Sequence, residues 1–248
     1  MRRSNPGLTC DGLKHSFSMY IITTKDGSHS LFSEEYDEIY HSGNGAIQES
    51  RHVFINSGFD YGVKNFLPPN GIETELKIFE IGFGTGLNAL LTIIAAQRQD
   101  ISLYYETIEK YPVPLDVIQE LNYTQILGDE KYHPPFHSMH SSTWGGEHAL
   151  TPNFTFKKNH ESLLNFQPAQ GAFHITYFDA FAPENQPEMW TVGVMKKLYQ
   201  SLQPNGILVS DCSKSAFRKA LVTAGFEVEK LQGPPGKREM VRAHKRTT

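Results

Sequence analysis

A glycine-rich turn between an apolar strand pattern and an apolar helix pattern constrains this chain more than any other feature. The mostly apolar residues 76–81 include the acid Glu80, and three glycines follow at alternate positions, Gly82, Gly84 and Gly86. Because glycine has no Cβ, such a turn lets the backbone pass close against a bound ligand. The third glycine comes one residue earlier than in the dinucleotide fingerprint G-x-G-x-x-G. The turn therefore predicts a nucleotide-type ligand without favouring a nicotinamide dehydrogenase.

The order E-x-G-x-G-x-G after a strand is typical of loops that bind S-adenosylmethionine. We therefore expect S-adenosylmethionine as the cofactor, and Glu80, Thr85 and Asn88 join the three glycines as candidate contacts to it. A methyltransferase is accordingly the first hypothesis for this chain.

Length and composition describe an ordinary globular chain. Its 248 residues, of which 39% are hydrophobic, suffice for one α/β domain with additional segments. No apolar run approaches the roughly 18 residues that a membrane span requires, and no apolar stretch follows Arg2 and Arg3 as in a secretory signal. Cys10 and Cys212 are far apart, so they indicate neither a disulfide framework nor a metal cluster. We expect a cytoplasmic protein that does not bind a membrane.

The hydrophobic pattern alternates between short strands and helices, which is typical of a parallel sheet. The fold class is therefore α/β, a Rossmann-like class I S-adenosylmethionine-dependent methyltransferase fold with a mostly parallel seven-stranded sheet. We expect residues 1–71 to form an N-terminal extension packed on a catalytic domain of residues 72–248. Residues 132–152 contain many helix breakers and are predicted to be an irregular insertion. Strands are expected at 76–81, 103–108, 154–157, 174–178, 206–211, 226–231 and 239–243, and helices at 86–98, 187–202 and 216–224.

Acidic and polar side chains follow the strands where a ligand of a parallel sheet binds. Glu109 follows the second strand, and a carboxylate there can accept hydrogen bonds from both ribose hydroxyls of a nucleoside. Lys110 beside it is a further candidate contact to the donor. The third strand leads to Asn159, His160 and Glu161, any of which is a candidate for the adenine amino group.

Asp179 follows the fourth strand, where a transferred methyl would face its acceptor. Transfer to nitrogen needs an uncharged amine, so a carboxylate that positions the amine and takes its proton suits this place. Phe178 and Phe181 would exclude water, and Phe181 and Pro183 are candidate substrate contacts. The alternative is that Asp179 caps the following helix.

Positive charge is concentrated near the C-terminal end. The net charge is −4, yet residues 214–248 contain nine Lys or Arg residues and only three acids. A local basic patch on an acidic body can bind RNA, because phosphate affinity depends on local charge. Lys237 and Arg238 are candidate phosphate contacts; a solvated tail and hairpin are the alternative.

Seven short segments carry a closer resemblance. The segments FEIGFGTGLN (79–88), IEKYP (108–112), DAFAP (179–183), PEMW (187–190) and GKREM (236–240) follow SEEYD (33–37) and ESRHVF (49–54). In this order they resemble the methyltransferase domain of the bacterial bifunctional enzymes that make 5-methylaminomethyl-2-thiouridine in tRNA (MnmC-type). The resemblance implies S-adenosylmethionine as donor and the 5-aminomethyl group of the wobble uridine as acceptor. It also implies Asp179 as the catalytic acid, Glu109 on the ribose, and the three glycines around the methionine part.

Two departures from that family qualify the resemblance. No second glycine fingerprint follows, so the chain resembles a stand-alone form without the FAD-dependent oxidase, and another enzyme must supply the aminomethyl substrate. The family has Gly-Asp where Asn159 and His160 stand. No metal is expected either: His133, His137, His140 and His148 suggest ligands, but Pro134 and Pro135 are predicted to prevent a helix there.

The resulting hypothesis is an N-methyltransferase that converts 5-aminomethyl-(2-thio)uridine to 5-methylaminomethyl-(2-thio)uridine in tRNA. One alternative is a methyltransferase or aminopropyltransferase that acts on a small-molecule amine and has no use for a basic tail. Another is a non-catalytic RNA-binding module with a vestigial nucleotide pocket, against which the intact Asp179 and Glu109 count.

Overall fold

A computed structural model of the protein describes residues 18–67 and 74–246. The predicted domain boundary between residues 71 and 72, Cys10 and the two N-terminal arginines lie outside the described residues. No helix in the described part is both long and apolar enough to cross a membrane. The strands of the main sheet are β4 (Glu75–Ile81), β5 (Ser102–Glu109), β6 (Glu147–Thr151), β7 (Phe154–His160), β8 (Phe173–Phe178), β9 (Leu202–Ser210), β10 (Glu227–Gln232) and β11 (Glu239–His244).

The main sheet has the predicted α/β architecture but one strand more than expected. Its order is β10-β11-β9-β8-β4-β5-β7-β6. The five central strands are parallel to one another: β9, β8, β4, β5 and β7. The outer strands β6, β11 and β10 each pair antiparallel with their neighbours. The extra strand is β6, which pairs with β7 although its residues fall in the segment predicted to be irregular.

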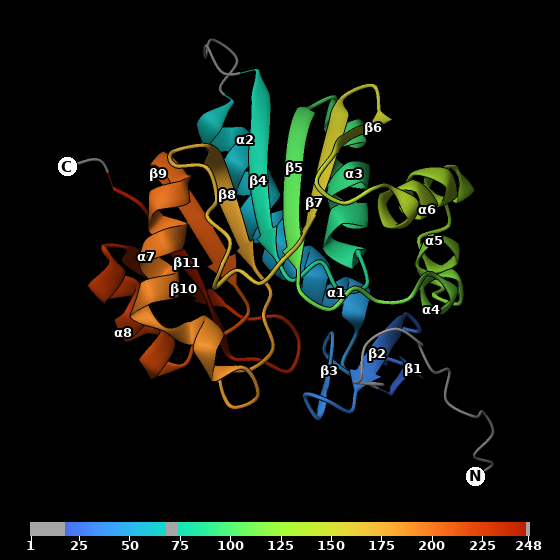
Figure 1. Ribbon diagram of the computed structural model, residues 1–248, viewed down its shortest axis with the longest axis horizontal. Coiled ribbons are helices and arrows are strands. Elements are labelled where there is room, and N and C mark those ends of the chain that lie inside the picture. Colours follow the sequence, from blue (N-terminus) through green and yellow to red (C-terminus); the bar gives the residue numbers. More distant parts are fainter. Residues whose placement is uncertain (1–17, 68–73, 247–248) are drawn as a thin grey trace.

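Helices cover both faces of the sheet, as Figure 1 shows. Adjacent residues of β4 serve opposite cores: Ile78 packs with α3, and Phe79 packs in the core that contains α7 and α8. Burial on both faces explains why the parallel strands are nearly continuous apolar runs. The helical segments are α1 (Ala46–Ser50), η1 (Arg51–Phe59, a π-helix), α2 (Asp60–Phe66), α3 (Leu87–Gln99), α4 (Leu115–Gln119), α5 (Tyr123–Ile126), η2 (Glu130–Tyr132), α6 (His133–Ser141), η3 (Pro187–Trp190), α7 (Val192–Ser201) and α8 (Ser215–Ala224).

Most of the segment 132–152, which was predicted to be irregular, forms a helix and a strand. Residues His133–Ser141 form helix α6 with its prolines in the first turn. Pro134 and Pro135 are tolerated there because the first N–H groups of a helix have no intrahelical acceptor to lose. Within the two described ranges, no group of three or more His, Cys, Asp or Glu side chains is arranged to hold a metal ion.

A small antiparallel sheet precedes the main one. Its strands β1 (Met19–Thr23), β2 (His29–Ser33) and β3 (Glu38–Ile39) lie below the large sheet in Figure 1, with α1 between the two. Glu38 Oε2 accepts hydrogen bonds of 2.9 Å from the Ala182 backbone N–H and from Asn185 Nδ2. The segment from β3 to α1 is thereby tied to the carboxyl end of β8.

The glycine turn after β4 holds three strand ends together. Gly82 N–H donates to the Ile108 carbonyl at 3.1 Å, and Asp179 N–H donates to the Ile81 carbonyl at 3.1 Å. Gly82 has a φ of +86°, and a Cβ built on it would lie 2.4 Å from the Asp179 carbonyl oxygen. Glycine is required here by both backbone conformation and space.

We expect Gly82→Ala to lower the free energy of unfolding by about 2 kcal/mol more than Gly128→Ala does. Both glycines have positive φ, at +86° and +68°, but no atom lies within 4 Å of a Cβ added at Gly128. Each variant therefore bears the conformational cost, and only Gly82→Ala also forces the β8 backbone away. Urea denaturation of the two variants measures the difference; equal losses would show that the close approach of the strand ends is unimportant.

Candidate active site

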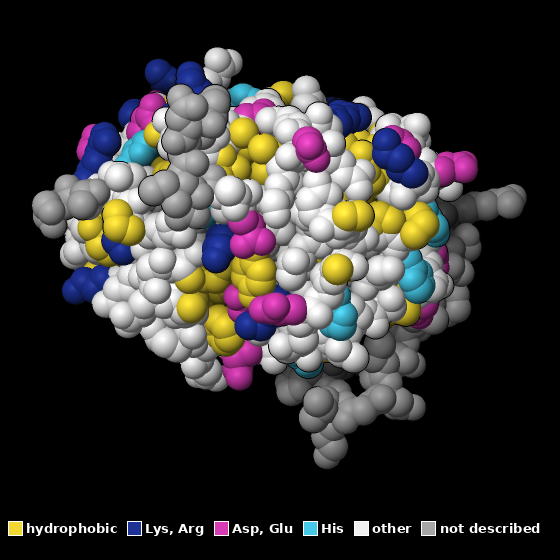
Figure 2. All heavy atoms as spheres, turned by 90° about the horizontal axis from the view of Figure 1, so that it is seen from above, with side chains coloured by type: hydrophobic (Ala, Val, Ile, Leu, Met, Phe, Trp, Pro, Cys, Tyr) yellow, Lys and Arg dark blue, Asp and Glu magenta, His cyan; other side chains and the backbone are white. Residues whose placement is uncertain are grey.

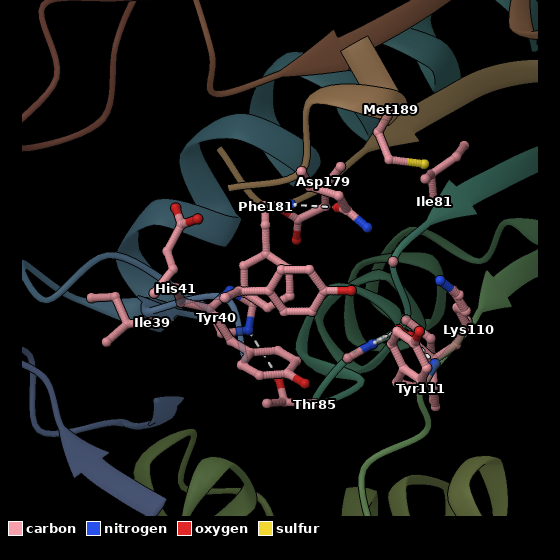
Figure 3. A pocket seen from close by; sticks show the side chains of 18 of the residues that line it. Ile39, Tyr40, His41, Ile81, Thr85, Lys110, Tyr111, Asp179, Phe181 and Met189 are labelled. Carbon is pink, nitrogen blue, oxygen red and sulfur yellow. Dashed lines mark hydrogen bonds between the residues drawn. The ribbon is translucent and has the colours of Figure 1, made fainter. Parts of the chain in front are cut away.

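A cavity of about 330 Å³ lies at the carboxyl ends of the central strands. Its wall combines the glycine turn, the residues after β5 and β8, and the segment from β3 to α1. Figure 3 shows Tyr40 and Phe181 in the middle, Asp179 to one side, and Lys110 and Tyr111 to the other. Of the predicted site residues, nine line this cavity: Gly82, Gly84, Thr85, Glu109, Lys110, Glu161, Asp179, Phe181 and Lys237.

Glu109 is fixed by backbone donors. Its Oε2 accepts from the Gly84 N–H at 3.0 Å and its Oε1 accepts from the Tyr111 N–H at 2.8 Å. Burial raises the pKa of Glu109, and these backbone hydrogen bonds oppose the rise by stabilising the carboxylate. Glu109 thus joins the glycine turn to the end of β5 and presents a fixed carboxyl group to the cavity.

Asp179 is held by a residue that was predicted to contact the donor. Asn88 Nδ2, on the first turn of α3, donates to Asp179 Oδ2 at 2.7 Å. Burial raises the pKa of Asp179 well above its usual range, and the nearby carboxyl of Asp211 raises it further. The Asn88 hydrogen bond opposes this rise. Asp179 is therefore an oriented carboxyl group whose proton affinity is increased, as a base for an amine proton requires.

Three aromatic rings line the same cavity as these two acids. Phe181 stacks on Tyr36 with ring centres 4.3 Å apart, and Tyr40 meets Phe181 edge-on at 5.0 Å. Tyr40 also lies over the glycine turn, where a Cβ on Gly84 would be 2.9 Å from its ring. Sequence reasoning missed Tyr36 and Tyr40 as site residues, although Tyr36 belongs to the SEEYD segment.

A buried hydroxyl network supports the glycine turn from below. Thr85 Oγ1 lies 2.9 Å from His41 Nε2 and accepts from the Tyr123 hydroxyl at 3.1 Å. Burial lowers the pKa of His41 to about 4, so its imidazole is neutral near pH 7. Thr85 is thus engaged by protein groups through its side chain, and His41 was not foreseen from the sequence.

Several predicted donor contacts lie outside the cavity. Glu80 is fully buried within β4, and burial raises its pKa well above the usual range. Gly86 caps α3 and packs against His140. Glu80 and Gly86 therefore flank the loop without lining the cavity. Phe178, which was predicted to exclude water from the reacting groups, is buried in the core beside Trp190.

The expectation for Asn159 and His160 is not supported by their positions. Both belong to β7, which is longer than predicted, and Asn159 Nδ2 donates to Glu106 Oε1 at 2.8 Å inside the sheet. The cavity wall at this strand end is instead formed by residues 161–163, which include the alternative candidate Glu161. The strand continues because its pairing with β5 extends to His160.

A second hollow adjoins the cavity. It contains Pro183 and Arg238, and shares Glu38, Ala180, Asp211 and Lys237 with the first cavity. Cys212 also lines it, and burial raises the pKa of this thiol to about 11, so a thiolate nucleophile is not favoured. Lys237 was predicted to contact phosphate, but its ammonium already pairs with Glu49 and Asp211.

The cavity suits S-adenosylmethionine on its own chemistry. Gly82 and Gly84 line the cavity with their backbone, and Glu109 offers carboxylate oxygens for ribose hydroxyls. Ile81, Ile108 and Leu163 add apolar walls of the kind that a flat base ring requires. When bound, S-adenosylmethionine supplies an electrophilic methyl group.

Sequence comparisons agree with this assignment. Residues 154–246 match a family described as S-adenosyl-L-methionine-dependent methyltransferase. The tRNA 5-methylaminomethyl-2-thiouridine biosynthesis bifunctional protein MnmC of Aeromonas hydrophila is 28% identical over 84% of this chain, and that of Burkholderia thailandensis is 30% identical over 89%. These matches cover 33% and 34% of the relatives, so the chain spans about a third of their length.

Solved structures show the same fold. MnmC2 from Aquifex aeolicus has a TM-score of 0.69 at 20% identity, covering 93% of this chain and 72% of that one. Spermidine synthase from Thermotoga maritima has a TM-score of 0.54 at 12% identity, covering 97% and 72%. Together, the sheet, the cavity and these comparisons identify the chain as an S-adenosylmethionine-dependent methyltransferase of the class I fold that resembles the methyltransferase part of MnmC-type proteins.

Proposed function

We propose that the protein methylates the amino group of 5-aminomethyl-(2-thio)uridine at the wobble position of tRNA. The observation that carries this proposal is the placement of Glu109 and Asp179 in the wall of one cavity that the glycine turn also lines. Glu109 and the glycine turn would hold the donor, and Asp179 would bind the acceptor amine. The similarity to MnmC-type proteins supports the choice of acceptor.

The geometry around Asp179 suits proton removal from an amine. Asn88 fixes one carboxylate oxygen, which leaves the other oxygen to accept a hydrogen bond from the amine. The raised pKa of Asp179 strengthens it as a base but also causes it to protonate at a higher pH than an ordinary carboxyl group. Phe181, Tyr36 and Tyr40 would exclude water from the reacting pair.

The cations expected to contact RNA are more dispersed than the sequence indicates. Strand β11 runs away from the cavity because it is antiparallel to β9. Val241 pairs with Ser210 at the carboxyl end of β9, and His244 pairs with Ile207, further from the cavity. In Figure 2, which views the opposite end of the sheet, Lys and Arg side chains lie among acidic ones. Within the described residues, five of the nine cations pair with carboxylates: Lys214, Lys230, Lys237, Arg242 and Arg246. Arg238, exposed beside the second hollow, is the better candidate for RNA contact.

Purified protein supplied with labelled S-adenosylmethionine should methylate tRNA that carries 5-aminomethyluridine, and Asp179→Asn should reduce the rate at least about 100-fold. Nucleoside mass analysis identifies the product, and calorimetry should show donor binding by the variant. The wild-type rate should fall on acidification at a higher pH than an ordinary aspartate would cause, because a base with a raised pKa becomes protonated earlier as the pH drops.

Transfer to small amines but not to this tRNA would support the alternative of a small-molecule enzyme. Absence of transfer to any amine, with RNA still bound, would support the non-catalytic alternative. Either result would refute the proposed reaction.

Glu109→Gln should weaken S-adenosylmethionine binding about 10- to 100-fold, because hydrogen bonds to a charged group contribute about 1.5–3 kcal/mol. Glu188→Gln is the matched control, since Glu188 is an exposed carboxylate that lines the same cavity. Titration calorimetry without RNA measures both dissociation constants. Equal affinities for the two variants would show that Glu109 does not hold the donor.

Arg238→Gln should reduce the slope of log affinity for tRNA against log salt concentration by about 0.7–0.9, the change expected for one lost phosphate contact. Arg246→Gln is the control, because Arg246 pairs with Glu227 at the far end of the hairpin. Fluorescence anisotropy over a salt series provides the slopes. A larger effect at Arg246 would place the RNA on the opposite face.

A further inference from the structure

The GKREM segment contains a lysine that is ion-paired with two acids of the cavity wall. Lys237 lies in the loop between β10 and β11, and its ammonium pairs with Glu49 Oε1 at 2.9 Å and with the Asp211 carboxylate. Glu49 belongs to α1, and Asp211 follows β9. One side chain therefore links the N-terminal segment, the central sheet and the final hairpin, and all three residues line the cavity that contains Asp179.

The loop that carries Lys237 is fixed against the N-terminal segment by further contacts. A Cβ on Gly236, whose φ is +91°, would lie 2.1 Å from Asn44 Nδ2. His52 Nε2 lies 2.8 Å from the Gln232 carbonyl oxygen. The ammonium is consequently held in place by packing on both sides of the loop, as a group that positions its neighbours must be.

Three carboxyl groups share one part of the cavity with the single ammonium of Lys237. Asp179, Asp211 and Glu49 face this corner of the cavity, and Asp211 and Lys237 also act on the neutral His41. Glu80 and Tyr105 approach Asp179 from the sheet side. Burial alone would lower the pKa of Lys237, but Asp211 and Glu49 outweigh it and raise that pKa above its usual range, so the ammonium stays charged.

We propose that Lys237 is a positioning residue for methyl transfer, which holds Glu49 and Asp211 as an ion-paired wall beside Asp179. This inference rests on the proposed function. With the lysine present, one ammonium offsets the two carboxylates next to the base. Without it, three carboxyl groups share a half-buried corner, and like charges in such a place favour protonation. Asp179 would then hold a proton at a pH where the wild-type residue is ionised.

The test compares Lys237→Met, Lys237→Arg and the control Lys230→Met, which alters another ion-paired lysine of the same hairpin. The rate constant kcat/KM with aminomethyl tRNA is measured over a series of pH values, and the pH range in which it falls on acidification is the acidic limb. In Lys237→Met this limb should lie about one pH unit higher than in the wild type. Lys237→Arg should restore the wild-type limb, and Lys230→Met should leave it unchanged. Asp211→Asn should move the limb in the opposite direction, because it removes a negative charge near Asp179.

Two measurements distinguish positioning from a merely structural role. The dissociation constant for S-adenosylmethionine should stay within about twofold of wild type, since the donor contacts lie across the cavity, and urea midpoints report folding. An unchanged acidic limb in Lys237→Met would overturn the inference, whether or not its urea midpoint falls.

A direct titration separates this inference from the proposed function. If wild-type protein fails to methylate tRNA, the proposed reaction is refuted, but carboxyl titration by NMR of protein labelled with ¹³C-aspartate still reports the Asp179 pKa. Asp179→Asn assigns its signal. That pKa should be higher in Lys237→Met than in the wild type, and equal values would overturn the inference.

Discussion

The site depends on the contact between the glycine turn and the ends of the neighbouring strands. Gly82 lies so close to the Asp179 carbonyl that no side chain fits, and its N–H binds the strand that ends at Glu109. The same few atoms therefore set the position of both acids. Parallel strands deliver their carboxyl ends to one edge, and the turn converts that common edge into a cavity with two fixed carboxyl groups.

Much of this arrangement was predictable because strand ends are local features. The apolar runs 76–81 and 174–178 marked strands buried on both faces, and an acid directly after such a run must lie at the ligand-binding edge. The length of β7 was less predictable, since its last residues are polar and are kept in the strand by pairing with β5. Asn159 was misplaced for that reason. Helix α6 was missed because prolines break a helix interior but not its first turn.

The other side of the cavity comes from residues that are remote in sequence. Tyr36, Tyr40 and His41 reach it through tertiary contacts, among them the hydrogen bonds by which Glu38 ties their segment to the residues after β8. No spacing rule predicts such a contact, since it joins residues more than 140 positions apart. The resemblance of the SEEYD and ESRHVF segments to a family indicated their importance, but their function in covering the cavity required the tertiary structure.

Charge shows the same dependence on tertiary contacts. The excess of cations in residues 214–248 suggested a basic surface, yet the antiparallel pairing of β10 and β11 sets Arg242 beside Glu229. Lys237 finds its acids on two other segments, so a residue counted as part of a basic tail acts inside an acidic corner. The net charge of a sequence segment therefore describes only its composition. The electrostatic potential at a site depends on which charged side chains the fold brings next to one another. In this protein the fold pairs the lysine of the hairpin with two carboxylates of the cavity wall and sets the adjacent arginine beside the second hollow, so neighbouring cations of one loop have different electrostatic surroundings.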